Sequence, residues 1–137
     1  MGEALTQELE LPWPPSVNHY YRHIGSKVLI SRDGRLYRER IVNHLKTENI
    51  DTFSGPVELF IELYPPDGRR RDVDNSLKCL LDTFTHGGLY RDDSQIYKLT
   101  VIKRDPMPPD GMAYVRIQEW NEDKTMAKNA VSSSDSC

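Results

Sequence analysis

The sequence feature that most constrains the fold is the strict alternation of apolar and polar side chains over residues 57–64 (VELFIELY). A repeat of two places successive side chains on opposite faces of a strand, so this segment predicts a strand with one buried face. Gly55 and Pro56, directly before it, mark a turn. A sheet that is apolar on one face must bury that face against another layer, so the rest of the chain has to supply a cover.

Two segments have the spacing of amphipathic helices and can supply that cover. In residues 35–48, apolar side chains recur every four positions, at Tyr37, Ile41 and Leu45. In residues 73–86, the apolar side chains with helical spacing are Val73, Leu77, Leu80, Leu81 and Phe84. We expect this second helix to end at HGG (86–88), where Gly87 can adopt the left-handed conformation that closes many helices. RDG (32–34), before the first helix, is expected to form a turn.

Shorter alternating or β-rich segments predict further strands at residues 7–11, 27–31, 97–103 and 113–120. The order strand, strand, helix, strand, helix, strand, strand predicts an α+β fold: a single domain with a mixed β-sheet and two main helices packed on one face. We place this domain at residues 1–120. The polar, aperiodic residues 121–137 are expected to form a disordered C-terminal tail.

The 137 residues carry a net charge of −3, which at first argues against a nucleic-acid partner. The acidic excess lies at the two ends, however, and residues 13–120 contain 16 basic and 15 acidic residues. Local clusters of charge are therefore a better guide to partners than the total. No apolar run approaches the roughly 18–20 residues of a membrane span. The two cysteines, Cys79 and Cys137, predict a reduced intracellular protein, because they are too few for a disulfide framework.

The stretch RRRDVDN (69–75) runs three arginines straight into Asp72 and Asp74, at the expected start of the second helix. Asp74 is a candidate N-cap, because its carboxylate can accept hydrogen bonds from the free N–H groups of the first turn. One interpretation is that both aspartates only cap the helix and offset the arginines. Capping accounts for one carboxylate and not for two, so a second role is expected.

Two further features extend this cluster. Lys78 follows Asp74 by four residues, one helical turn along the same face; a simple surface ion pair is the alternative explanation. LYRDDSQI places Asp92 and Asp93 before the next strand, where a solvated turn is the alternative. The helix is about 20 Å long, and residues 87–93 can span roughly 23 Å when extended. We therefore expect Asp93 to return beside Asp72 and Asp74.

Carboxylates that converge without a nearby histidine or cysteine suit a hard divalent cation such as Mg²⁺, which prefers oxygen ligands. His86 is at the far end of the helix and is poorly placed as a ligand. The sequence has no EF-hand loop, no glycine-rich phosphate loop and no Gly-x-Ser-x-Gly turn. The pattern predicts metal-assisted hydrolysis or phosphoryl transfer. Lys78 would stabilise transition-state charge or assist the leaving oxygen, and the arginines would bind a nucleic-acid backbone.

These residues resemble a known family. RRRDVDNSLK followed by LYRDDSQI, together with the N-terminal LPWPPSVNHYYRH, is similar to the RusA family of Holliday junction resolvases from about residue 9 to residue 120. The resemblance implies a small homodimeric endonuclease that depends on Mg²⁺, with Mn²⁺ as a substitute. It also implies resolution of four-way DNA junctions by symmetric paired nicks, in recombination and repair. The expected setting is a bacterial cytoplasm, with a phage or prophage origin.

The resemblance also assigns roles by position. The catalytic and metal-binding carboxylates are Asp72, Asp74 and Asp93, and the catalytic lysine is Lys78. Asp92 and Asn75 are assigned a supporting role. The residues assigned to DNA binding, with support of the site as an alternative for the last three, are Arg69, Arg70, Arg71, Asn18, Tyr21 and Arg22.

Two other classes of function stay open. A non-catalytic binder of junctions or duplexes would keep the arginines and tolerate loss of the aspartates, although bare carboxylates repel DNA unless a metal lies between them. A Mg²⁺-dependent phosphohydrolase of small phosphates would need a phosphate cradle, and none is evident. The sequence does not reveal the base preference, the number of metals or the dimer interface. It also leaves open whether each site belongs to one subunit.

Overall fold

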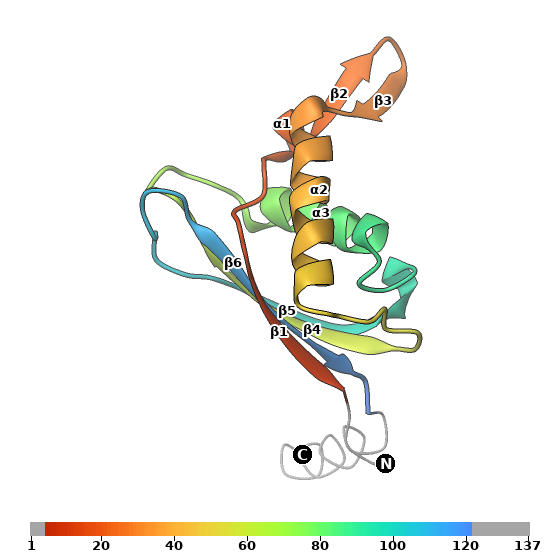
Figure 1. Cartoon of the computed structure of the whole chain (residues 1–137). Coiled ribbons are helices and arrows are strands. Elements are labelled where there is room, and N and C mark those ends of the chain that lie inside the picture. Colours follow the sequence, from red (N-terminus) through yellow and green to blue (C-terminus); the bar gives the residue numbers. More distant parts are fainter. Residues whose placement is uncertain (1–4, 122–137) are drawn as a thin grey trace, which may run out of the picture.

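The computed structural model describes residues 5–121 (Figure 1). The predicted tail, apart from Asn121, lies outside the described residues. The elements, in chain order, are β1 (Thr6–Leu11), α1 (Val17–Tyr20), β2 (Tyr21–Ile24), β3 (Lys27–Ile30), α2 (Arg32–Thr47), β4 (Val57–Tyr64), α3 (Val73–Gly87), η1 (Asp93–Gln95), β5 (Ile96–Lys103) and β6 (Met112–Glu119). The predicted α+β class with a mixed sheet is confirmed.

The main sheet has the order β1-β6-β4-β5, in which β4 and β5 are parallel and the other pairs are antiparallel. Strand β4 shows the predicted alternation, with buried residues at every second position. Its buried side chains are Val57, Leu59, Ile61 and Leu63. Each such side chain contributes about 1.5–3 kcal/mol when it leaves water, so the pattern read from the sequence sets the face that must be covered.

Helices α2 and α3 both lie over that face of the sheet (Figure 1). The residues of α2 predicted to face inward, Tyr37, Ile41 and Leu45, are all buried. From α3, Leu80 and Phe84 join the same core. In the described part of the chain, no helix is both long and apolar enough to cross a membrane.

Helix α2 begins earlier than predicted, because RDG (32–34) is its first turn and not a separate turn. Ser31 is the N-cap, and its Oγ accepts a hydrogen bond from the Gly34 amide at 2.9 Å. Gly34 is required by packing, since a Cβ there would collide with the carbonyl oxygen of Tyr20. At the other helix, the left-handed closing residue is Gly88, with φ of 83°, and not Gly87.

Elements α1 and β2 were not predicted from the sequence, since each spans only four residues and so shows no clear periodicity. Strands β2 and β3 pair as an antiparallel hairpin. This hairpin stands away from the main sheet, beyond the start of α2 (Figure 1). Its position brings the end of α1 and the first residue of β2 against the two long helices.

Candidate active site

The first turn of α3 follows the loop that leaves the end of β4. Asp72 is the N-cap residue, with extended backbone, and Asp74 lies inside the first turn. Asp74 was predicted as the N-cap, so that expectation is corrected by two positions. The Asp72 side chain makes no capping hydrogen bond. Both carboxylates are still favoured here, because the helix dipole places partial positive charge at its N-terminus.

Asp72 and Asp74 share a property that distinguishes them from a structural pair. Both residues are exposed, and within residues 5–121 neither carboxylate has a hydrogen bond or an ion pair. The neighbouring arginines therefore do not neutralise them, contrary to the purely structural interpretation. Two free carboxylates on one helical turn match the way Mg²⁺ is commonly held, by one or two carboxylates plus water and substrate oxygens.

Asp93 lies at the opposite end of the sheet, so its predicted return to Asp72 and Asp74 does not occur within one chain. Strand β5 runs parallel to β4, and Ile96 pairs with Val57 at the start of β4. Asp72, in contrast, follows the end of β4. Eight residues at about 3.3 Å each separate the two ends by roughly 25 Å. Helix α3 runs back along the sheet, as Figure 1 shows, so the residues after it lie near the start of β4.

The described residues of one chain consequently bring no third carboxylate to Asp72 and Asp74. No group of three or more His, Cys, Asp or Glu side chains between residues 5 and 121 is arranged to hold a metal ion. The roles assigned to Asp72, Asp74 and Asp93 by resemblance remain predictions. If all three act together, the third carboxylate has to come from outside the chain that supplies the first two.

Asp92 has a structural task that explains its place beside Asp93. Its Oδ2 accepts a hydrogen bond from the Ser94 amide at 3.0 Å. The Ser94 side chain, and then this amide, lower the pKa of the Asp92 carboxyl. The Gln95 side chain accepts in return from the Asp92 amide, which completes a capping box. Gln95 also donates to the carbonyl of Phe53. Asp92 therefore supports the segment that presents the exposed Asp93.

Lys78 is exposed and lies one helical turn beyond Asp74. The alternative surface ion pair between them is not formed, and no carboxylate in the described part of the chain lies within ion-pair distance of Lys78. Its Nζ lies instead 5.6 Å from the centre of the Tyr21 ring. Such a cation–π contact holds an ammonium group without neutralising it.

The three arginines of the 69–75 stretch differ in how they are held. Arg71 is partly buried and donates to Asp67 Oδ1 at 2.7 Å. This hydrogen bond is the main reason that the pKa of Asp67 falls to about 2. The Arg69 side chain is 83% exposed, and its Nε is 3.8 Å from Asp67 Oδ2, a longer contact than that of Arg71. Arg70 has no partner among the described residues, so Arg69 and Arg70 are the two that are available to an anion.

An open cleft of about 630 Å³ lies beside the first turn of α3. Residues 13–16 with His19 line one side, and Pro66, residues 69–72, Asn75 and Ser76 line the other. The second side includes all three arginines, Asp72 and Asn75. The cleft thus combines cationic side chains with one of the free carboxylates, an arrangement that suits a phosphate-bearing ligand.

The residues that line the cleft differ in part from those assigned to DNA binding from the sequence. Asn18 and Arg22 are exposed on α1 and β2, and neither lines the cleft. Trp13 and His19 do line it, although the family resemblance did not assign them to the site. The available signal was the PWPPS segment, because its prolines force the chain to turn and so set the wall of the cleft.

Known proteins with similar sequences are enzymes that act on DNA, which agrees with this site. The family model of endodeoxyribonuclease RusA matches residues 12–125. Relatives named crossover junction endodeoxyribonuclease RusA occur in Shigella sonnei (strain Ss046), at 37% identity, and in Escherichia coli (strain K12), at 36% identity. A relative of the same name from Enterobacteria phage 82 is 37% identical. Each match spans 119 residues, which is 86% of this chain and 98% of the relative.

These matches identify the class of protein as an endodeoxyribonuclease, an enzyme that cuts DNA internally. The chain belongs to the RusA family of endodeoxyribonucleases. The match covers the cleft, the first turn of α3 and the segment of Asp92 and Asp93. The resemblance drawn from the sequence is thereby confirmed.

Proposed function

We propose that this chain is a Mg²⁺-dependent endonuclease that resolves four-way (Holliday) DNA junctions by symmetric paired nicks. The observation that carries the proposal is the pair of exposed, unpartnered carboxylates beside an arginine-lined cleft. The names of the relatives supply the substrate class, since they are crossover junction endodeoxyribonucleases. The phage relative supports the expected setting, the cytoplasm of a bacterial host.

Each residue has a physical task in this proposal. Arg69 and Arg70 bind backbone phosphates, because arginine contacts phosphate oxygens bidentately. Asp72 and Asp74 hold the divalent cation, for which Mn²⁺ is the expected substitute. A bound cation would polarise the scissile phosphate and lower the pKa of an attacking water. Lys78 donates to the phosphate oxygens, where it stabilises the negative charge that grows in the transition state.

A homodimer completes this site in the proposal. Asp93 is separated from Asp72 and Asp74 by the length of β4. In a two-fold dimer, any contact from one region to another occurs twice, so Asp93 of each chain can serve the helix start of its partner. Two equivalent sites also match the near two-fold symmetry of a four-way junction. Paired nicks then follow from one encounter.

The decisive experiment uses a labelled four-way junction and a linear duplex of matching sequence. Each is incubated with the protein in Mg²⁺, in Mn²⁺ or in EDTA, and the strands are separated on a denaturing gel. The proposal expects paired nicks in the junction alone, with either metal and not with EDTA. Tight junction binding without cleavage in any metal would favour a non-catalytic junction binder. Hydrolysis of small phosphates with no nicking would favour a phosphohydrolase.

Mixed dimers test the shared site. Asp74→Asn and Asp93→Asn chains are inactive alone in this proposal. When they are mixed and refolded together, a shared site places both changes in one site and leaves the other site wild-type. Nicking should therefore return in the mixture, at one strand per junction. A mixture as inactive as its components would mean that each site lies within one chain.

A further inference from the structure

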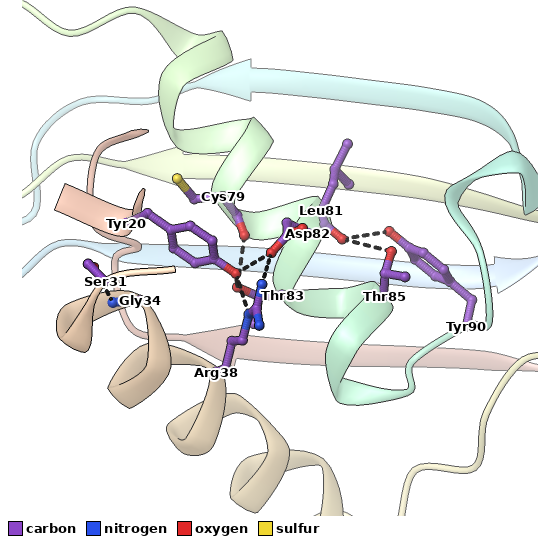
Figure 2. Close-up of polar contacts among 10 residues, drawn as sticks. All are labelled: Tyr20, Ser31, Gly34, Arg38, Cys79, Leu81, Asp82, Thr83, Thr85 and Tyr90. Carbon is purple, nitrogen blue, oxygen red and sulfur yellow. Dashed lines mark hydrogen bonds and ion pairs between the residues drawn. The ribbon is translucent and has the colours of Figure 1, made fainter. Parts of the chain in front are cut away.

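Three residues from three different helices form a partly buried polar network (Figure 2). Tyr20 of α1 is fully buried. Its hydroxyl accepts a hydrogen bond from Arg38 Nε at 2.8 Å and donates to the Asp82 carboxylate of α3. Arg38 of α2 closes the triangle, with its Nη2 2.7 Å from Asp82 Oδ2. The network thus joins α1, α2 and α3 through a single carboxylate.

Asp82 is the natural ion-pair partner of Lys78. It follows Lys78 by four residues on α3, and side chains at that spacing are neighbours on a helix surface. The carboxylate is nevertheless occupied by Arg38 and Tyr20, and no ion pair links it to Lys78. Arg38 and Tyr20 therefore keep the Asp82 carboxylate from pairing with Lys78.

The same network fixes the ring against which Lys78 rests. Tyr21 follows Tyr20 directly, and their rings meet edge to face with centroids 4.8 Å apart. The Tyr21 ring lies 5.6 Å from Lys78 Nζ. Long side chains on a helix lean toward its N-terminus, so Lys78 is directed toward the turn that carries Asp74.

We propose that Tyr20, Arg38 and Asp82 form a positioning network that keeps Lys78 free of its own helix and holds it against Tyr21, ready for a scissile phosphate. This rests on the proposed function, in which Lys78 stabilises the transition state. A lysine has a long, flexible stem and is easily captured by a nearby carboxylate. A lysine that must leave an ion pair before each reaction contributes less to the rate, so the network acts on cleavage and not on DNA binding.

The first test removes Arg38 and then removes the acid that it restrains. Arg38→Met frees Asp82 to capture Lys78, and single-turnover junction cleavage should fall roughly tenfold, given the strength of charged hydrogen bonds. The double variant Arg38→Met/Asp82→Asn has no carboxylate at position 82 to capture Lys78, so cleavage should recover most of that loss. A role in folding alone predicts the opposite, because the double variant has lost still more of the network.

A matched control is Arg40→Met, which removes an arginine two residues along the same helix. Arg40 is exposed and outside the network, so its variant should cleave at the wild-type rate. Thermal melting and junction binding are measured for every variant. The proposal is overturned if folded Arg38→Met cleaves as fast as the control, or if the double variant is no faster than Arg38→Met.

The second test changes the ring and leaves the network intact. Tyr21→Leu removes the cation–π contact and should slow cleavage roughly fivefold, with junction affinity little changed. Tyr21→Phe keeps the ring and should cleave several-fold faster than Tyr21→Leu. Equal rates for the two variants would remove Tyr21 from the positioning role.

These outcomes are separable from the proposed function. If the wild-type protein does not nick junctions, or Lys78→Ala nicks them normally, the proposed function or the role of Lys78 has failed. If the wild-type nicks them and Lys78→Ala does not, only the Arg38, Asp82 and Tyr21 variants decide this inference.

Discussion

Helix α3 carries aspartates in two opposite situations. Asp82, near its middle, has a side chain only 28% exposed and shares its carboxylate between Arg38 and Tyr20. Asp72 and Asp74, at its start, are exposed, and neither carboxylate has a partner in the described part of the chain. A carboxylate removed from water needs partners to stay charged, whereas an exposed one does not. The partly buried aspartate therefore supports the fold, and the exposed pair is left free to bind a cation.

The difference separates stability from chemistry along one helix. A site that binds a cation and a phosphate must keep some charges unsatisfied until its ligands arrive. Such charges are tolerated at a helix N-terminus, where water and the helix dipole both favour carboxylates. The network at Asp82 holds the helix in place only two turns away. Substitutions that remove this contrast at single positions should therefore separate activity from stability.

Asp74→Asn should abolish the activity and spare the fold. Single-turnover junction cleavage should fall at least about a hundredfold, because the cation loses a ligand and its charge stabilisation. Stability should change by less than about 1 kcal/mol, since the residue is exposed and only the helix-dipole term is lost. Cleavage is measured on a denaturing gel and stability by urea unfolding. A variant that cuts at the wild-type rate would remove Asp74 from the mechanism.

Asp82→Ala should destabilise the fold. The free energy of unfolding should fall by about 2–3 kcal/mol, because Arg38 and Tyr20 both lose their acceptor in a partly buried place. The measurement is the midpoint and slope of urea unfolding, with Asp74→Asn as the matched aspartate control. A loss no larger than that of Asp74→Asn would mean that the two kinds of aspartate do not differ in the stability they supply.

Tyr20→Phe should change how stability depends on pH. Burial, and then the hydrogen bond to Asp82, raise the pKa of Tyr20 to about 12 from an ordinary value of 10.0. The folded state thus retains this proton when the unfolded chain has lost it, so wild-type stability should fall as pH rises from 10 to 12. The contribution of Tyr20 is on the order of 2 kcal/mol.

Tyr37 and Tyr90 also have raised pKa values, mainly through burial, and they contribute to this decline in both proteins. Unfolding is followed by denaturant titration at several pH values. Tyr20→Phe should give a shallower decline than wild type over the same interval. Parallel curves would show that the Tyr20 proton does not couple to folding.

The smallest effects concern the arginines, which repeat the contrast between free and paired groups. Arg70→Ala should reduce the salt slope of junction binding by about 1, as expected when one phosphate contact is lost. Arg71→Ala should change that slope less, because Arg71 is already committed to Asp67. The dissociation constant is measured at several salt concentrations. Equal changes in slope would mean that Arg71 leaves Asp67 to bind DNA.

Local patterns determined most of the elements and the first half of the site. The alternation of residues 57–64 predicted β4 with its observed bounds, Val57–Tyr64. Helical spacing predicted α3 to within one residue of its end, Gly87. The placement of Asp74 and Lys78 one turn apart follows from the helix alone. These features depend on neighbours in sequence, so the sequence was enough to predict them.

Only the tertiary structure decided where Asp93 lies and what Asp82 does. The position of Asp93 depends on the direction of β5, which is set by pairing with β4, and a parallel pairing sends that residue to the far end of the sheet. The network of Tyr20, Arg38 and Asp82 joins positions 18, 44 and 62 residues apart. Periodicity carries no information about such pairs, because the packing of three helices creates their proximity.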